Sequence, residues 1–309
     1  MAESTDLREA ISDAVKPGTS LYITGFTHLI NFAAAHEIIR LGIKDLTLIR
    51  LTPDVVYDQM VGAGVAKKLV FSYLGNPGVG NLHAIRRAIE GGDLEWDEYT
   101  HGSLIAALRA GASGLPFAPV EAVGRTDLHR YNDAFQFVTC PFTEQETAVV
   151  RPLRPDVAIV HVQRADRNGN AQVWGSVGDI REAAHAAQHV IVTAEEIVDE
   201  DLLRTDPNRT VMLGLHVDRL VEAPWAAHPS YAQGSYARDN QFYRRWAELS
   251  STPEGVEQYL QEEVFGVDGR QQYLELHRER ALELSRVGEL MSSPVNFGDN
   301  AAIAAVQEQ

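Results

Sequence analysis

Short, almost wholly apolar segments recur between residues 20 and 193, and segments with helical spacing lie between them. Unbroken short apolar runs are typical of strands that are buried on both faces of a parallel sheet. The predicted strands are residues 20–24, 46–51, 69–73, 157–162 and 190–193, and the predicted helices include 32–41, 82–90 and 180–189. This alternation predicts an α/β fold, with an open, mainly parallel sheet flanked by helices.

Size and charge narrow the classes of function. A chain of 309 residues, 45% hydrophobic and 23% charged, can bury a sizeable core in one large domain or two smaller ones. Its net charge of −16 disfavours nucleic-acid binding, which needs a basic face. Any anionic ligand must therefore be held by local donors and not by the overall field.

The expected compartment is the cytoplasm. The acidic N-terminal segment lacks the basic end and apolar middle of a signal peptide, and no apolar run is long enough to span a membrane. The single cysteine, Cys140, excludes an internal disulfide and is expected to fill the core.

Ligands of open α/β sheets bind beyond the carboxyl ends of the strands, so the loops there are candidate sites. Two of these loops are rich in glycine: residues 24–28, with Gly25, Phe26 and Thr27, and residues 75–81, with Asn76, Gly78 and Gly80. The second loop matches neither the dinucleotide fingerprint nor the Walker loop. Each could expose backbone N–H groups to an anion, or could be a plain turn.

A third candidate lies before the helix predicted at residues 103–110. Glu98, Thr100 and His101 crowd together there, followed by Gly102. Because the helix dipole favours negative charge at the N-terminus, Glu98 could be only a helix-start residue, or it could take part in chemistry.

The remaining motifs give little indication of a catalytic or metal site. No zinc-binding spacing and no GxSxG nucleophile elbow occurs, so we expect no metal site and no serine nucleophile. The pair Glu195 and Glu196 is expected in a solvated turn. Residues 124–152, rich in turn formers, are expected to be a long excursion that folds against the sheet.

The motifs, taken in order, resemble those of one family. LYITGF, RRAIEGG, EYTHGSLIAALRAGASGLPF, PDVAIVHVQRADRNGNA and EAPWAAHPS are together similar to the alpha subunits of class I coenzyme A transferases, such as the alpha subunit of glutaconate CoA-transferase. The likeness runs over about residues 6–265. We therefore predict a transferase alpha-subunit domain at residues 1–265 and a helical extension and tail at 266–309.

The resemblance implies one half of a heteromer, a heterodimer or heterotetramer, whose active site lies at the boundary with a homologous beta subunit. The beta subunit would supply the glutamate that attacks an acyl-CoA and passes CoA to a carboxylate. Coenzyme A thioester would be a substrate, with no tightly bound cofactor. Gly25, Phe26, Thr27, Asn76, Gly78, Gly80, Thr100, His101 and Gly102 would shape the substrate pocket.

The first glycine loop departs from the family pattern. Thr24 replaces a glycine, and Leu29, Ile30 and Phe32 stand where the family often has basic residues or glycine. We therefore expect a more apolar acyl group than a short dicarboxylate.

Two other functions remain open. Steroid-ring hydrolases of the same superfamily open a cyclic β-diketone of a CoA thioester with a glutamate that Glu98 resembles in position, and Glu98 would then be a general base. Some sugar-responsive regulators share the general fold, but no basic helix-turn-helix is present here.

Overall fold

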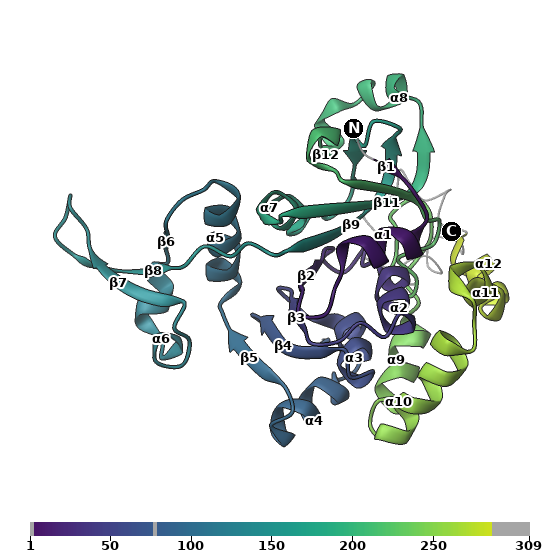
Figure 1. Cartoon of the computed structure of the whole chain (residues 1–309), viewed down its shortest axis with the longest axis horizontal. Helices are drawn as coiled ribbons and strands as arrows, with labels where there is room; N and C mark the ends of the chain where they lie inside the picture. The colour runs from purple at the N-terminus through teal and green to yellow at the C-terminus, as the bar shows by residue number, and fades with distance from the viewer. Residues whose placement is uncertain (1–2, 77–78, 286–309) are drawn as a thin grey trace, which may run out of the picture.

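The computed structural model describes residues 3–76 and 79–285, and they build one large sheet covered by helices on both faces (Figure 1). Eight of its ten strands form a continuous series, in spatial order β1 (Glu3–Ser4), β13 (Arg219–Glu222), β11 (His189–Val198), β9 (Val157–Asp166), β2 (Ser20–Ile23), β3 (Leu46–Ile49), β4 (Ala66–Phe71) and β5 (Glu95–Glu98). All neighbours in this series pair in parallel. The short strands β10 (Ala171–Gln172) and β12 (Thr210–Met212) add antiparallel pairs, so the predicted mainly parallel sheet is confirmed.

The strand order reverses between β2 and β9. The chain builds β2 to β5 outward on one side, then returns to β9 beside β2 and builds β11 and β13 outward on the other side. In open sheets the crevice at such a reversal is the usual ligand site. The five predicted strands are all present, and β9 and β11, at ten residues each, are longer than the sequence indicated.

Alternate residues of the strands face opposite helix layers, as the pleat requires. Leu21 and Ile23 join the core of the first layer, whereas Tyr22 joins the core of the second. The first layer contains α1 (Leu7–Ala14), α2 (Phe32–Arg40), α3 (Asp54–Gly62) and α4 (His83–Gly91). The second contains α5 (His101–Ala112) and α7 (Ile180–Ala186).

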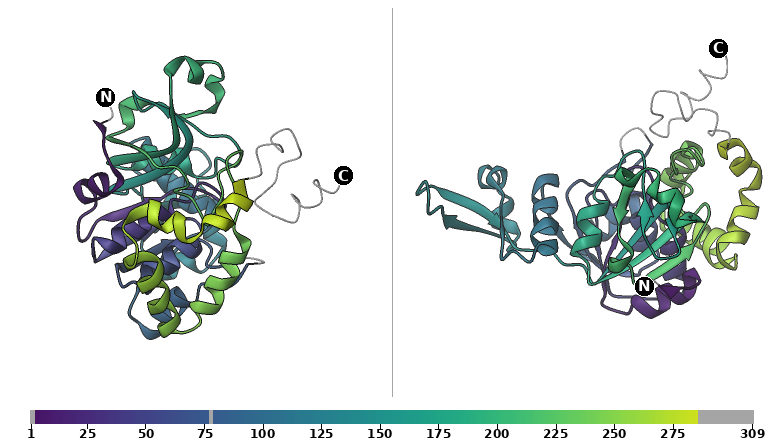
Figure 2. Two further views of the ribbon diagram at one scale, coloured as in Figure 1. Left: turned by 90° about the vertical axis from the view of Figure 1, so that its right-hand side faces the viewer. Right: turned by 90° about the horizontal axis from the view of Figure 1, so that it is seen from above.

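A small arm projects from the body beyond α5 (Figure 1 and, seen from above, Figure 2). It consists of β6 (Ala118–Pro119), η1 (Glu121–Arg125), α6 (Leu128–Tyr131), β7 (Phe135–Thr139) and β8 (Glu146–Val150). Its strands form a separate antiparallel sheet in the order β6-β8-β7. The prediction that residues 124–152 fold against the main sheet is therefore wrong, because they pair with one another and pack on α5.

Cys140 also differs from its prediction. It lies in the turn between β7 and β8, where it is partly exposed and unpaired with any sulfur of the described residues. The neighbouring Phe142 is 93% exposed. The apolar appearance of this segment therefore belongs to the tip of the arm and not to the core.

The remaining elements complete the body. Near the long strands lie α8 (Glu200–Arg204), η2 (Pro207–Arg209) and η3 (Gly214–His216). The C-terminal helices are α9 (Asn240–Leu249), α10 (Pro253–Tyr259), η4 (Leu260–Phe265), α11 (Gly269–Leu276) and α12 (Arg278–Leu284). α10 packs on α3, and both η4 and α11 pack on α2. The predicted tail lies mostly in residues 286–309, outside the described part of the chain.

Candidate functional site

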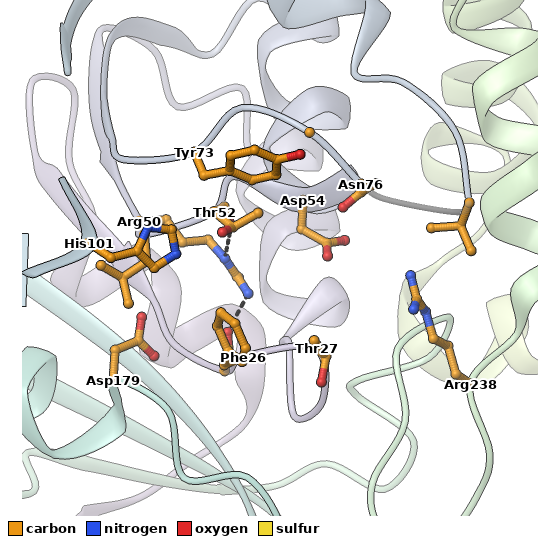
Figure 3. A pocket seen from close by; sticks show the side chains of 14 residues that line it. Phe26, Thr27, Arg50, Thr52, Asp54, Tyr73, Asn76, His101, Asp179 and Arg238 are labelled. Carbon is orange, nitrogen blue, oxygen red and sulfur yellow. Dashed lines mark hydrogen bonds between the residues drawn. The ribbon is translucent and has the colours of Figure 1, made fainter. Parts of the chain in front are cut away.

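A cavity of about 430 Å³ opens at the carboxyl ends of β2, β3, β4 and β5 (Figure 3). Each of these strands contributes a loop to the wall, because carboxyl ends of parallel strands meet at one edge of a sheet. The first two loops give Gly25, Phe26, Thr27, Arg50, Leu51, Thr52 and Asp54, and the next two give Tyr73, Gly75, Asn76, Val79 and His101. Asp179, before α7, and Arg238, before α9, close the cavity from other parts of the chain.

Gly25 is required by the shape of the first loop. Its φ of +105° is one that residues with a side chain rarely adopt, and an added Cβ would lie 2.6 Å from the carbonyl oxygen of His28. Thr27 and Leu29 also have positive φ. The loop thus makes a tight coil directly after β2, which presents Phe26 and Thr27 to the cavity.

Arg50 fastens this loop to the next one. The side chain is buried, and its Nε donates to the carbonyl of Thr52 at 2.7 Å. Its other nitrogens donate to the carbonyls of Ile23 and Gly25. Because all three acceptors are backbone oxygens, Arg50 serves as a clamp between the loops after β2 and β3.

Asp179 places a carboxyl group at the cavity wall. The hydroxyl of Tyr22 donates to its Oδ2, and Oδ1 has no hydrogen-bond partner among the described residues. Burial raises the pKa of Asp179, while the Arg50 guanidinium and the Tyr22 hydroxyl oppose this shift. A buried acid with a raised pKa is typical of functional sites, although ion-pair networks produce the same effect.

His101 is the part of the third candidate segment that reaches the cavity. Its Nδ1 lies 2.9 Å from the Ser72 hydroxyl, which itself donates to the carbonyl of Leu51. Because the hydroxyl proton of Ser72 goes to Leu51, Nδ1 of His101 is the donor in its contact with the Ser72 oxygen. Thr100 is instead the N-cap of α5, and its Oγ1 accepts from the backbone N–H of Ser103 at 3.0 Å.

Glu98 lies apart from this cavity. It is the last residue of the edge strand β5, it is exposed, and its backbone pairs with Phe71. Its carbonyl accepts from the side chain of Asn132 at 2.9 Å. The helix-start role belongs to Thr100, two residues further on, and not to Glu98.

The cavity therefore brings together five of the predicted residues: Gly25, Phe26, Thr27, Asn76 and His101. Gly80, Glu98, Thr100 and Gly102 do not line it, and Gly78 lies outside the described residues. Gly80 has a packing reason of its own, since an added Cβ would meet that of Ala247 on α9 at 2.3 Å.

Sequence reasoning missed Arg50, Asp54, Asp179 and Arg238. Arg50 directly follows an apolar strand, and a charged residue at the carboxyl end of a buried strand could have indicated a site residue. Asp54 begins α3 with a φ of 59° and accepts from its neighbour Val55 through its own carboxylate. Asp179 and Arg238 gave no local signal, because only the fold brings them to the cavity.

Two other interpretations need correction. Leu29, Ile30 and Phe32 are fully buried in the core, so their apolar character does not indicate an apolar acyl group. Glu195 lies within β11 and not in a solvated turn: its carboxylate accepts from His161 Nε2 and from the backbone N–H of Trp225, both at 2.7 Å.

Across residues 3–76 and 79–285, no three side chains of His, Cys, Asp or Glu gather as they would around a metal ion. In the same residues, no helix combines the length and the apolar character needed to cross a membrane.

Comparison with known proteins points to one family. The sequence model of the family described as Coenzyme A transferase matches residues 4–223. The chain is 47% identical to the "A" subunit of 3-oxoadipate CoA-transferase from Pseudomonas knackmussii, over 86% of this chain and 95% of that protein. It is 33% identical to the "A" subunit of glutaconate CoA-transferase from Acidaminococcus fermentans, over 89% and 91% of the two chains. The crystal structure of that organism's glutaconate CoA-transferase superposes with a TM-score of 0.88, at 31% identity, over 92% and 95%.

A hydrolase is similar at a lower level. The cholesterol ring-cleaving hydrolase IpdA subunit of Rhodococcus jostii is 30% identical over 84% of this chain and 92% of that protein.

Proposed function

Because this chain belongs to the coenzyme A transferase family and is the alpha subunit of a two-subunit CoA-transferase, we propose that its substrates are dicarboxylic acids and their CoA thioesters. One observation carries the proposal: the relative that matches at 47% identity over nearly its whole length is named for 3-oxoadipate, a dicarboxylic acid. 3-Oxoadipate is therefore the first candidate acceptor.

The beta subunit is proposed to supply the attacking glutamate. Within the described residues, each of the two carboxyl groups at the cavity uses one oxygen in a structural hydrogen bond: Asp54 accepts from Val55 at the start of α3, and Asp179 accepts from Tyr22. A carboxylate of the partner would attack the thioester carbonyl, so that CoA thiolate leaves and a mixed anhydride forms. The thiolate would then attack the glutamyl side of the anhydride and release the first acid, and the acceptor carboxylate would take CoA by the reverse steps.

The alpha subunit would contribute the acyl pocket. The Gly25 loop, Asn76 and His101 form walls of this pocket, and Arg50 holds the Gly25 loop in place. Preorganised donors in such a pocket would lower the barriers on both sides of a covalent intermediate. We propose a heterodimer or heterotetramer that works in the cytoplasm, where CoA thioesters are metabolised.

The hydrolase alternative has less support. It needs Glu98 as general base, and Glu98 is exposed on β5 and does not line the cavity. The relatives named as transferases also share more identical residues with this chain than the hydrolase does.

The test is a CoA balance in the complex of this chain with its beta subunit. With succinyl-CoA as donor and 3-oxoadipate as acceptor, we expect 3-oxoadipyl-CoA to appear as succinyl-CoA disappears, with no free thiol released. Borohydride added with succinyl-CoA alone should modify a glutamate of the beta subunit. Free CoA formed without an acceptor would instead show a hydrolase, and a modified carboxylate in this chain would refute the assignment of the nucleophile.

A further inference from the structure

We propose that Arg238 selects dicarboxylic substrates by binding the carboxylate at the far end of the acyl chain. This inference rests on the proposed function and adds to it a residue that reads the substrate. Arg238 lies in the segment before α9, far from Arg50 in the sequence, yet both line the same cavity. Figure 3 shows it on the opposite side of the cavity from His101 and Arg50.

The guanidinium group is held in place by an aromatic ring. Its central carbon lies 4.0 Å from the centroid of Tyr243, one turn into α9. Tyr243 is fully buried, so this platform cannot shift without disturbing the core. Stacking fixes the plane of an arginine while leaving its N–H groups free to bind.

Those N–H groups have no partner within the described residues. Among residues 3–76 and 79–285, no carboxylate lies within ion-pair distance of Arg238, its side chain forms no hydrogen bond, and its buried Nε has no partner. Arg50 differs from Arg238 in this respect, because its guanidinium donates hydrogen bonds to three backbone carbonyls. The terminal nitrogens of Arg238, which no described residue occupies, are the groups that would donate to a ligand oxygen.

The chemistry of the cavity selects a carboxylate at the end of a carbon chain. The fork of a guanidinium matches the two oxygens of a carboxylate. Phe26, Leu51, Tyr73 and Val79 add apolar surface to the lining of the cavity, which suits methylene groups. Since the whole chain carries a charge of −16, a dianionic acid needs such a local cation to offset the overall field.

The two carboxyl groups that line the cavity with Arg238 each have another hydrogen-bond partner. Asp54 is tied to the N-terminus of α3 through Val55, and Asp179 lies against Tyr22 and Arg50. Neither forms an ion pair with Arg238. A diacid could therefore enter with its second carboxylate on Arg238, whereas a monocarboxylic acid would leave the guanidinium unpaired.

The experiment compares two acceptors of equal length, 3-oxoadipate and 3-oxohexanoate, in the complex with the beta subunit. Because a covalent intermediate separates the half-reactions, kcat/KM for the acceptor reports only the second one. For Arg238→Met, loss of hydrogen bonds to a charged group should lower kcat/KM for 3-oxoadipate about 10- to 100-fold. For 3-oxohexanoate, kcat/KM should stay within about twofold of the wild-type value, because this acid has no second carboxylate that could bind Arg238.

Arg238→Lys keeps the charge and loses the fork, so its preference for the diacid should be intermediate, and it serves if the methionine variant folds poorly. Arg86→Met, an exposed arginine of α4, is the matched control and should leave both acceptors unchanged. An equal loss for both acceptors would assign Arg238 to CoA phosphate binding or to the fold, and unchanged preference in both variants would also overturn the inference. A wild-type complex that transfers CoA to neither acid would refute the proposed function itself.

Discussion

At the scale of single residues, the site depends on side chains whose roles differ from what their neighbours in sequence suggest. Glu98, Thr100 and His101 stand within four positions, yet one ends an edge strand, one caps a helix and one lines the cavity. Spacing in a loop cannot separate these roles, because the direction of each side chain depends on where the strand ends and the helix begins.

Glu98→Gln separates the two enzymatic interpretations. Since Glu98 is exposed and outside the cavity, the substitution should change CoA transfer by less than about threefold, whereas a general base contributes roughly a hundred- to ten-thousandfold. Steady-state rates of the complex measure this, with Glu95→Gln, an exposed residue of the same strand, as control. A hundredfold loss confined to Glu98→Gln would favour the hydrolase.

Gly25→Ala should damage the site through its backbone. The new Cβ would meet the His28 carbonyl at 2.6 Å, and overpacking of this kind costs about 1–3 kcal/mol of unfolding free energy. Gly42→Ala is the matched control, because Gly42 also has a positive φ, of +65°, but has nothing within 4 Å of an added Cβ. Denaturant unfolding of both variants should show the larger loss at Gly25, and equal losses would assign the requirement to φ alone.

At the scale of elements, the loop between β13 and α9 is tied to the C-terminal helices by buried polar groups. His228 Nδ1 lies 3.1 Å from the Tyr273 hydroxyl of α11, and its Nε2 lies 3.4 Å from Asp239 Oδ2, before α9. Tyr273 is fully buried. The described part of the predicted extension after residue 265 thus packs against the domain it follows.

His228 should make folding sensitive to acid. Burial lowers the pKa of His228 from 6.5 to about 4, so between these values the unfolded chain binds the proton that the folded chain excludes. Stability from this group is present above pH 6.5 and is lost as the pH falls toward 4, by up to about 1.4 kcal/mol per pH unit. Relative to His228→Gln, the wild type should therefore lose unfolding free energy on acidification.

Urea unfolding at about pH 7, 6 and 5, across the range in which histidine titrates, checks this difference. The exposed His216→Gln serves as control and should stay within about 0.5 kcal/mol of the wild type at each pH. A constant gap between wild type and His228→Gln over the three pH values would contradict the assignment.

Elements differ in how well the sequence predicts them. The parallel strands were found because burial on both faces makes them unbroken apolar runs, as in β9. The strands of the arm were not predicted. β7 buries Phe135 but exposes Gln136 and Phe137, and the sequence of such a half-exposed strand resembles that of a loop. The roles of Arg238 and Asp179 at the cavity were not predicted for a different reason. The order of the strands brings these residues to the cavity, and no local sequence pattern encodes that order.

At the scale of the whole molecule, the arm carries apolar side chains into solvent. Phe142 is 93% exposed and Tyr131 is 80% exposed, and both belong to the arm that Figure 2 shows projecting from the body. Exposed apolar groups that cluster on one projection usually mark an interaction site. The partner expected for an alpha subunit is its beta subunit.

The double substitution Tyr131→Ser and Phe142→Ser should therefore weaken the complex. Loss of buried aromatic anchors typically costs over about 1 kcal/mol each, so we expect Kd for the beta subunit to rise at least about tenfold. Calorimetric titration measures this, with Leu215→Ser, 75% exposed on the body, as control. Unchanged affinity in the double variant, with CoA transfer intact, would place the subunit interface elsewhere.

The reversal of strand order between β2 and β9 also bears on how such proteins diversify. The walls of the cavity come from separate loops, while the sheet beneath them is fixed by parallel pairing of its strands. An insertion or exchange in one loop leaves the other walls and the sheet register in place. Natural selection can therefore alter the acid that is accepted by changing a few positions at strand ends, without rebuilding the scaffold that the relatives share.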